Sequence, residues 1–466
     1  MVTLDWFVFG LVLVATVASV FYGSYLKRDQ GSDESESENF LDLLLMGRKL
    51  TLPLFVATLV ATWYGGIFGV TEIAFNQGIY NFVTQGAFWY LAYILFAFFI
   101  VDKVAIYQAM TLPDLIGKMF GPYSAKLAAV FNFFNVLPIA YVMSLGIFIN
   151  LLFGWSMWVS MLCGVLIVIA YSLYGGFRAV VFSDLVQFFV MCSGVLLILI
   201  LSFHHFGGVG FLLENLPPGH WSPTGNVGLG PTLVWGFIAL STLVDPNFYQ
   251  RCFAAESSAI AKRGILFSTI IWFCFDICTT LGAMYAKAVI PEAESGHAYL
   301  TYALQLLPAG IRGFVLAGIL ATILSTLDSY LFLAGTTLSF DLAPKKWKGK
   351  VLIHHLGVIL VGAIAFLMAL VFKDIKTVWK TLGSYSAACL LLPVVYGYLF
   401  PGKIKDKHFV FSCLLGVVAT TLWRNWERTG FAKNIDELYA GIAATSTGLL
   451  LSFLWEKKSK TRQHNA

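Results

Sequence analysis

The chain has 466 residues, of which 58% are hydrophobic, 16% aromatic and only 12% charged, and its mean hydropathy is +0.79. A soluble domain carries about 25% charged residues, so the composition excludes an ordinary soluble protein. The net charge of +5 does not indicate nucleic-acid binding, because the basic residues are sorted between alternate loops. Apolar runs of about 18 or more residues recur throughout and predict an all-α polytopic protein embedded in a lipid bilayer.

In chain order, the apolar runs predict about 13 transmembrane helices. They cover residues 6–26, 51–75, 80–102, 124–152, 155–174, 179–202, 230–250, 264–289, 310–340, 351–372, 377–400, 408–424 and 438–456. Asp5 and the lack of a basic leading segment predict that the first run is retained and not a cleaved signal. An acidic, Ser-rich stretch follows this run and is expected to be a solvated loop, with a regulatory phosphorylation loop as the alternative.

The distribution of Lys and Arg predicts the orientation. Loops after odd-numbered spans hold about 22 of these residues and loops after even-numbered spans hold about 8, and the positive side of a membrane protein faces the cytoplasm. We therefore expect the N-terminus outside and the C-terminus in the cytoplasm, with the chain in the plasma (inner) membrane.

Two of the predicted spans carry helix-breaking residues. Gly65, Gly66 and Gly69 fall inside the second span, and Asp245-Pro246 falls inside the seventh. Proline removes a backbone donor and glycine lowers the cost of unwinding. Interrupted helices five spans apart indicate the binding site of a transporter built from two inverted five-helix repeats. Close helix packing is the alternative explanation for the glycines.

The ninth span carries a polar stripe in an otherwise apolar sequence. Thr322, Ser325, Thr326 and Ser329 follow the spacing i, i+3, i+4, i+7, with Asp328 beside them. A charge at the centre of a membrane costs at least ~2.5–3.5 kcal/mol. Hydroxyl and carboxylate oxygens are ligands for hard cations, so the stripe predicts a site for an ion such as Na⁺. The alternative is that these hydroxyls only bond to their own helix or pack closely.

Two further acids lie inside predicted spans. Asp184 follows Arg178 by six residues, which is poor spacing for a direct contact on a helix, and we expect it to face Ser325 and Asp328 across the bundle. A pair between Arg178 and Asp184 is the alternative. Asp276 has no obvious cationic neighbour, and the spans contain almost no Lys or Arg.

Three segments carry a resemblance to a known family. "GGFRAVVFSDLVQ", "YQRCFAAES" and "ILATILSTLDSYL" are similar to signatures of the solute:sodium symporter (SSS) family, over about residues 1–400. The resemblance implies a LeuT-type fold with one extra N-terminal and two extra C-terminal helices. The implied divisions are an N-terminal helix (1–26), an acidic cytoplasmic loop (27–50), the first repeat (51–202), an extracellular loop (203–229), the second repeat (230–400), and two last helices with a short cytoplasmic tail (401–466).

The resemblance also implies a sodium site. Its ligands would be the side chains of Ser325 and Thr326, the carbonyl of Thr322, and backbone carbonyls near Leu59 and Thr62, with Asp184 beside them. Some members bind a second sodium between this Asp and hydroxyls one turn further along the helix. Because those positions are Asp328 and Ser329 here, the chain is expected to bind one or two Na⁺.

The solute site is expected at mid-membrane, between spans 2, 3, 7, 8 and 11. Asp245 and Gln85 align with positions that bind the solute in sugar-transporting relatives. The expected site residues are Trp63, Gln85, Asp245, Phe248, Tyr249 and Asp276. The intramembrane acids favour a cationic or zwitterionic solute, such as an amino acid or a choline-like molecule.

The predicted function is sodium-coupled import of a small organic solute by alternating access, for which a monomer suffices. A sugar- or pantothenate-type sodium symporter is the main alternative, and a proton-coupled transporter and a non-transporting solute sensor are less favoured. An enzyme is not expected, because the Tyr-Asp and Gly-Asp pairs of intramembrane aspartyl proteases do not occur in the sequence.

Overall fold

The computed structural model describes residues 1–28, 36–173, 175–372, 374–429 and 435–464. Within these ranges the chain is helical and forms no β-strand, apart from an isolated backbone bridge between Leu50 and Ala255. Ten of the described helices are long and apolar enough to cross a membrane. The predicted all-α polytopic membrane fold is therefore confirmed.

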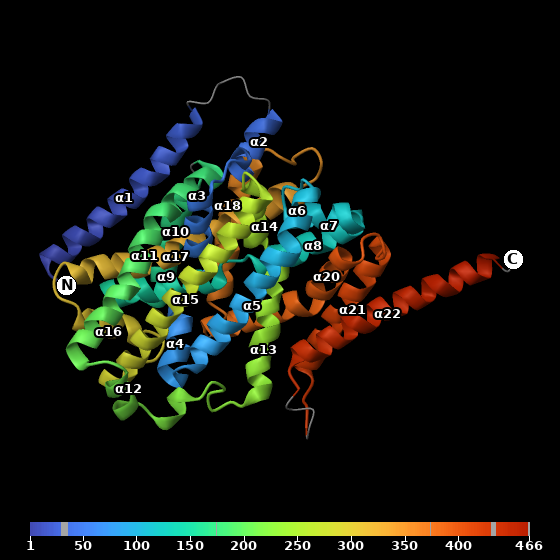
Figure 1. Cartoon of the computed structure of the whole chain (residues 1–466). Coiled ribbons are helices and arrows are strands. Elements are labelled where there is room, and N and C mark those ends of the chain that lie inside the picture. Colours follow the sequence, from blue (N-terminus) through green and yellow to red (C-terminus); the bar gives the residue numbers. More distant parts are fainter. Residues whose placement is uncertain (29–35, 174, 373, 430–434, 465–466) are drawn as a thin grey trace.

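The α-helices follow one another along the chain as labelled in Figure 1. They are α1 (Thr3–Arg28), α2 (Glu36–Leu45), α3 (Leu52–Ala61), α4 (Ile67–Gln77), α5 (Phe88–Leu95), α6 (Val101–Ile106), α7 (Leu112–Phe120), α8 (Pro122–Asn135), α9 (Ile139–Phe153), α10 (Met157–Ser172), α11 (Gly176–Phe206), α12 (Val209–Asn215), α13 (Leu229–Leu240), α14 (Pro246–Ala254), α15 (Ser258–Val289), α16 (Ala298–Leu306), α17 (Ile311–Thr336), α18 (Val351–Ala369), α19 (Ile375–Ser386), α20 (Leu392–Leu399), α21 (Asp406–Asn425) and α22 (Glu437–His464).

Short 3₁₀ and π segments join or extend these helices. The 3₁₀ turns are η1 (Met46–Arg48), η4 (Pro218–Trp221) and η5 (Ser241–Val244), and the π segments are η2 (Phe82–Ala87), η3 (Phe96–Ile100), η6 (Thr337–Asp341) and η7 (Ala387–Leu391). The π segments continue neighbouring helices, so that η2, α5, η3 and α6 together cover the third predicted span. Extra residues in a helical turn re-aim the side chains around them.

The ten spanning helices account for all but three of the predicted spans. The second span is divided into α3 and α4, the fifth is the short helix α10, and the twelfth is α21. The predicted total of thirteen and the proposed division into repeats remain predictions.

Both predicted helix breaks are present. Thr62–Gly66 separates α3 from α4, and η5 with the extended residue Asp245 separates α13 from α14. The glycines also permit close approach, because a Cβ on Gly65 would overlap Thr326 and a Cβ on Gly66 would overlap the ring of Trp379. A third break was not expected: the span predicted at 124–152 divides into α8 and α9 just before and after Pro138.

Helix α17 lies at the centre of the bundle, where α11, α3, α9 and α18 pack around it (Figure 1). In its membrane window 89% of the residues are buried, compared with 17% for α1. The polar stripe is therefore in the interior and cannot be solvated by lipid headgroups or bulk water. Its polar groups must find partners on the neighbouring helices.

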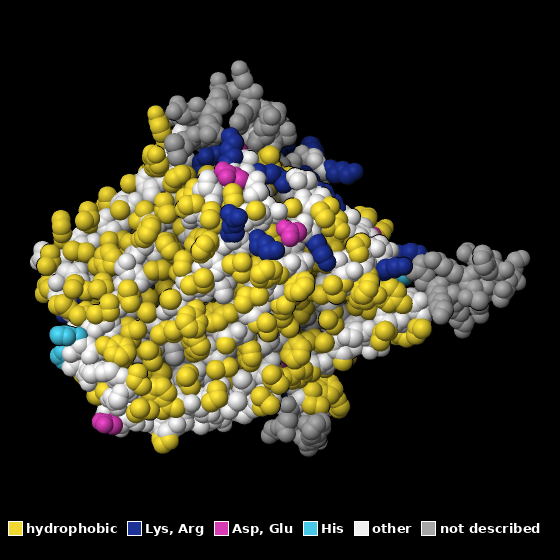
Figure 2. Space-filling view, in the orientation of Figure 1, with side chains coloured by type: hydrophobic (Ala, Val, Ile, Leu, Met, Phe, Trp, Pro, Cys, Tyr) yellow, Lys and Arg dark blue, Asp and Glu magenta, His cyan; other side chains and the backbone are white. Residues whose placement is uncertain are grey.

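The segment expected to be a solvated loop is partly helical. Residues 29–35 lie outside the described ranges, but Glu36–Leu45 forms α2, in which Leu44 and Leu45 are fully buried. Arg178 donates to Asp42 of α2 at 2.7 Å. The alternative pair between Arg178 and Asp184 is therefore wrong. In Figure 2 the Lys and Arg side chains of the visible face gather in its upper half, the half in which Figure 1 places α2, α6 and α7.

Candidate functional site

Oxygen atoms converge where α17 passes the break between α3 and α4. The Ser325 hydroxyl lies 2.8 Å from the carbonyl oxygens of both Ala61 and Ala321, and 3.2 Å from that of Thr322. The Thr326 hydroxyl lies 3.1 Å from the Thr322 carbonyl and 3.5 Å from that of Ala61. All three side chains of the stripe are fully buried. This set of uncharged oxygens suits a hard monovalent cation.

The backbone partner in this group differs from the one expected. The carbonyl that faces Ser325 and Thr326 belongs to Ala61, the last residue of α3, and not to Leu59 one half-turn earlier. Thr62 is nearby, but it contributes its hydroxyl to a neighbouring group of polar residues. The alignment that proposed Leu59 is thus displaced by two residues.

Asp184 of α11 lies in that neighbouring group. It accepts a hydrogen bond from the Thr58 hydroxyl at 2.5 Å, and the Thr62 hydroxyl lies 3.5 Å from the same carboxylate oxygen. The Ser329 hydroxyl of α17 lies 3.2 Å from that of Thr62. The structure therefore brings Asp184 together with the break in α3/α4 and with α17, as expected.

Arg251 is the residue of this group that we did not expect. It belongs to α14, its side chain is fully buried, and its Nη2 donates to the hydroxyls of Thr62 at 2.7 Å, Ser329 at 3.0 Å and Thr58 at 3.1 Å. The same nitrogen lies 3.9 Å from Asp184. The expectation that the spans are almost free of cationic side chains misses this one. Its signal is its place, six residues after the Asp245-Pro246 break.

Asp328 faces away from the Thr58 and Thr62 hydroxyls, toward α10. Tyr171 donates a hydrogen bond of 3.1 Å to one of its carboxylate oxygens, and the other is buried without a hydrogen-bond partner among the described residues. Asp328 is 1% exposed. A buried carboxylate that is only half satisfied requires a nearby positive charge or a proton.

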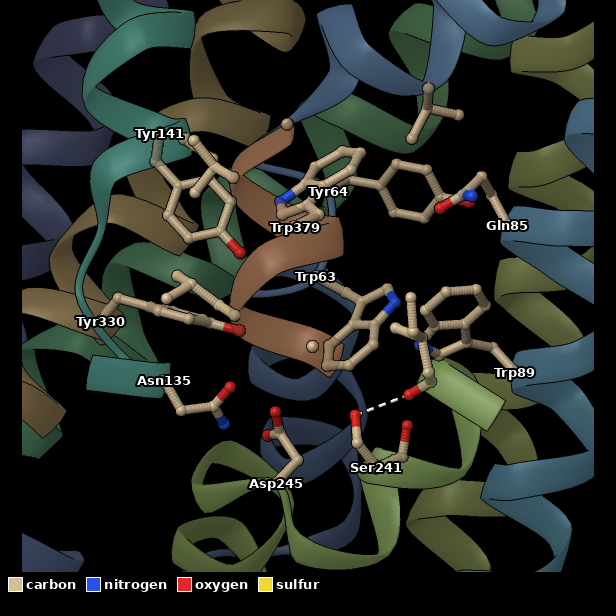
Figure 3. Close-up of a pocket in the computed structure, with 18 of the residues that line it drawn as sticks. Trp63, Tyr64, Gln85, Trp89, Asn135, Tyr141, Ser241, Asp245, Tyr330 and Trp379 are labelled. Carbon is tan, nitrogen blue, oxygen red and sulfur yellow. Dashed lines mark hydrogen bonds between the residues drawn. The ribbon is translucent and has the colours of Figure 1, made fainter. Parts of the chain in front are cut away.

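A cavity of about 130 Å³ lies on the other side of the α3/α4 break (Figure 3). Of the expected solute residues, Trp63, Gln85 and Asp245 line it. The lining also includes residues that we did not expect, namely Tyr64, Trp89, Asn135, Tyr141, Trp235, Ser241, Thr242, Tyr330 and Trp379. Four tryptophans and three tyrosines therefore surround the space, and among the described lining residues there is no Lys or Arg.

Asp245 forms the floor of the cavity. One of its carboxylate oxygens caps α14 by accepting from the backbone N–H groups of Asn247 at 2.8 Å and Phe248 at 3.4 Å. In Figure 3 the carboxylate points up into the cavity, between Asn135 and Ser241. Capping engages one oxygen and leaves the other available, so the capping role and a solute-binding role are compatible.

Three expected solute residues do not line this cavity. Phe248 is fully buried and packs against Trp63, with ring centroids 5.6 Å apart. Tyr249 donates to the Leu243 carbonyl at 2.9 Å. Asp276 accepts a hydrogen bond from Tyr90 on the far side of α5. Phe248 and Tyr249 thus support the floor from behind, and Asp276 belongs to a separate contact between α5 and α15.

Several of the missed residues had a weak signal in the sequence. Asn135 stands three residues before Pro138, at the third helix break, and polar residues at broken helices commonly line binding sites. Trp379 lies on α19 opposite Gly66, and each requires the other, since only glycine leaves room for the ring. Tyr141 and Tyr330 pack edge to face with centroids 4.8 Å apart, a contact between distant segments that has no local signature.

An ion pair lies one helical turn beyond the cavity. Lys376 of α19 donates to Glu72 of α4 at 2.7 Å, and both side chains are partly exposed. Because Gly66 and Val70 of α4 and Val378 of α19 line the cavity, this pair joins the two helices that form one of its ends.

Comparison with known proteins agrees with this architecture. The model of the Sodium:solute symporter family matches residues 44–401. The chain is 24% identical to the osmoregulated proline transporter OpuE of Bacillus subtilis (strain 168) over 383 residues, covering 76% of each protein. It is 25% identical to the sodium/pantothenate symporter of Escherichia coli (strain K12) over 467 residues, covering 94% of this chain and 95% of the relative. A solved structure of a Na⁺-coupled sialic acid symporter superimposes with a TM-score of 0.76 at 16% identity, covering 97% of both chains.

Proposed function

Because the chain belongs to the sodium:solute symporter family, we propose that it uses the entry of Na⁺ to import a small organic solute that carries a positive charge, either a cation or a zwitterion. The observation that carries this proposal is the Asp245 carboxylate at the floor of an aromatic cavity with no Lys or Arg among its described lining residues. The proposed location is the plasma membrane, with the N-terminus outside. One chain contains the whole cavity, so a monomer suffices.

The proposed sodium ligands are the hydroxyls of Ser325 and Thr326 and the carbonyls of Thr322 and Ala61. These groups come from two elements, α17 and the end of α3, so an ion bound among them holds the two together. Trp63 and Tyr64 follow Ala61 in the same unwound segment and line the solute cavity. Ion binding therefore fixes the segment that forms the solute site, which is a physical route for coupling the two.

The energy available from one ion is sufficient for accumulation. Moving one Na⁺ down a potential of about 100 mV releases about 2.3 kcal/mol, and a tenfold concentration gradient adds about 1.4 kcal/mol. Together these terms support roughly 500-fold accumulation of a neutral solute.

Charge and ring chemistry favour the solute class. An ammonium group above Asp245 would be paired with a buried carboxylate, and the tryptophan and tyrosine rings would each add about 0.5–2 kcal/mol of cation–π attraction. An anionic solute would instead face Asp245 without a cationic partner. Proline, the solute in the name of one relative, is a zwitterion with such an ammonium group.

A single substitution tests the proposal. We expect Asp245→Asn to weaken the binding of the best cationic or zwitterionic solute by about tenfold or more, since the charge pair is lost, and to leave Na⁺ binding without solute nearly unchanged. The measurement is a thermal-stability screen of choline, betaine, amino acids, pantothenate and sugars, with and without Na⁺, followed by titration of the best solute.

Asp276→Asn is the matched control, because it removes an intramembrane carboxylate that lies outside the cavity, and it should not change solute affinity. A neutral sugar as the best solute, with Asp245→Asn tolerated, would contradict the proposed solute class. That outcome would favour the second candidate, a sugar symporter, for which the amides of Gln85 and Asn135 and the Ser241 hydroxyl offer hydrogen bonds.

A further inference from the structure

The buried polar group around Asp184 contains its own cation. The Nη2 atom of Arg251 lies within 2.7 to 3.1 Å of three hydroxyl oxygens, from α3, from the break after it, and from α17. Its other terminal nitrogen, Nη1, donates to Asn247 at 3.2 Å and to Gln250 at 3.0 Å. The guanidinium is therefore held from two directions at a defined point and is not a side chain reaching toward solvent.

The oxygens around this nitrogen are those that a metal ion at the same point would need. The Ser329 and Thr62 hydroxyls point their lone pairs at Nη2, and Asp184 lies 3.9 Å from it. Each of these atoms is buried. A Na⁺ ion cannot share them, because it would have to displace the guanidinium or lie against another positive charge.

The charges of the surrounding residues lead to a definite count. Asp184 and Asp328 are both buried acids that reach the same region from α11 and α17, and Arg251 compensates one of them. The neighbouring set formed by Ser325, Thr326 and the Thr322 and Ala61 carbonyls is uncharged. Two carboxylates and one guanidinium leave a single negative charge in the membrane interior, where unbalanced charge is costly.

We propose that Arg251 takes the place of a second transported cation, so that the chain binds and carries one Na⁺ per cycle. The inference rests on the proposed sodium coupling and specifies its ion count. Asp328 is then the counter-charge of the arginine and not a ligand of a second ion. The single Na⁺ at Ser325 and Thr326 completes the charge balance of the region.

Equilibrium binding of radioactive ²²Na⁺ to the purified chain in lipid nanodiscs, without any solute, tests the count directly. The wild type should bind one Na⁺ per chain with a Hill coefficient near one. Arg251→Met leaves two carboxylates without their cation and should bind two. Arg251→Met combined with Asp328→Asn restores the charge balance and should return the count to one.

Two further variants keep the test decisive if Arg251→Met does not fold. Arg251→Lys preserves the charge and should still bind one Na⁺. Asp328→Asn alone removes the negative charge that remains for sodium and should weaken Na⁺ binding by at least about tenfold. Arg263→Met is the matched control, since Arg263 is exposed on α15, and it should behave as the wild type.

Thermal stability as a function of Na⁺ concentration provides a second measurement of the same Hill coefficients. Two ions per wild-type chain, or unchanged Na⁺ affinity in Asp328→Asn, would overturn the assignment of Arg251 while leaving sodium coupling intact. A wild-type chain that binds no Na⁺ at all would instead contradict the proposed function itself.

Discussion

Ser325 and Thr326 illustrate how one side chain can serve both the helix and an ion. Each hydroxyl lies within hydrogen-bonding distance of a carbonyl of its own helix, as the structural alternative to a sodium site requires. Each also lies near the Ala61 carbonyl of another helix, which back-bonding within α17 does not explain. The contact across the break is what makes these two residues sodium ligands in the proposed function.

Removal of both hydroxyls should separate ion binding from folding. We expect Ser325→Ala with Thr326→Ala to abolish Na⁺-stimulated uptake in proteoliposomes and Na⁺-dependent thermal stabilisation. The chain should still fold, because each lost hydrogen bond is worth only about 1 kcal/mol. Thr336→Ala is the control, since its hydroxyl bonds to Phe332 of the same helix at 2.9 Å. Full Na⁺ dependence in the double variant would mean that the sodium site lies elsewhere.

Local sequence predicted the side chains of the sodium group better than its backbone. Hydroxyl and carboxyl residues at helical spacing are visible in the sequence, and Ser325, Thr326, Ser329 and Asp184 do meet. A carbonyl ligand has no residue-type signature, which is why Leu59 was proposed where Ala61 lies. Arg251 was missed for a related reason, since the partners that compensate its charge come from α3 and α17, far along the chain.

At the scale of the elements, the divided helices are what bring the ion group and the solute cavity together. The breaks at Gly65-Gly66 and at Asp245-Pro246 were predicted because glycine and proline act locally. The break before Pro138 was not, since its surroundings are uniformly apolar. Helix α2 was missed because its acidic, Ser-rich start resembles a loop, and its burial depends on tertiary contacts such as the one between Asp42 and Arg178.

Gly65 provides a test at this scale, because it sets the distance between α17 and the break. A Cβ at this position would overlap Thr326 and the ring of Tyr141, and relief of such overpacking costs about 1–3 kcal/mol. We expect Gly65→Ala to lower the melting temperature and to weaken Na⁺ binding by about tenfold or more, as measured by Na⁺-dependent thermal shift.

The control for this change is Gly10→Ala, since an added methyl group on α1 would have no neighbour within 4 Å. It should leave both melting temperature and Na⁺ affinity unchanged. Wild-type Na⁺ affinity in Gly65→Ala would show that the distance between α17 and the break does not determine the ion site.

On the scale of the whole molecule, the two ends of the solute cavity are built differently. One end is an aromatic cluster of Trp63, Phe248 and Trp272 with fully buried neighbours. At the other end α4 and α19 are joined by the partly exposed pair of Glu72 and Lys376. A packed cluster is costly to open, whereas an exposed ion pair contributes about 0–1 kcal/mol. The cavity should therefore exchange its contents past the ion pair.

Lys376→Gln tests this asymmetry. Loss of the pair should increase both the association and the dissociation rate of the solute, while the equilibrium affinity changes by less than about fivefold. Stopped-flow tryptophan fluorescence can follow binding, because four tryptophans line the cavity. Lys118→Gln, which removes the exposed pair with Asp114 at 3.3 Å, should leave the rates as they are. Unchanged rates in Lys376→Gln would place the route of exchange elsewhere.

The backbone bridge between Leu50 and Ala255 affects how many parts of the molecule can move independently. The Leu50 N–H donates to the Ala254 carbonyl at 3.0 Å, and the Glu256 N–H donates to the Leu50 carbonyl at 3.2 Å. These bonds join the start of α3 to the end of α14, and Arg251 joins the same two helices through Thr58. The two half-helices therefore share one mechanical degree of freedom, so a solute pressing on Asp245 and an ion pressing on Ala61 act on a single rigid body.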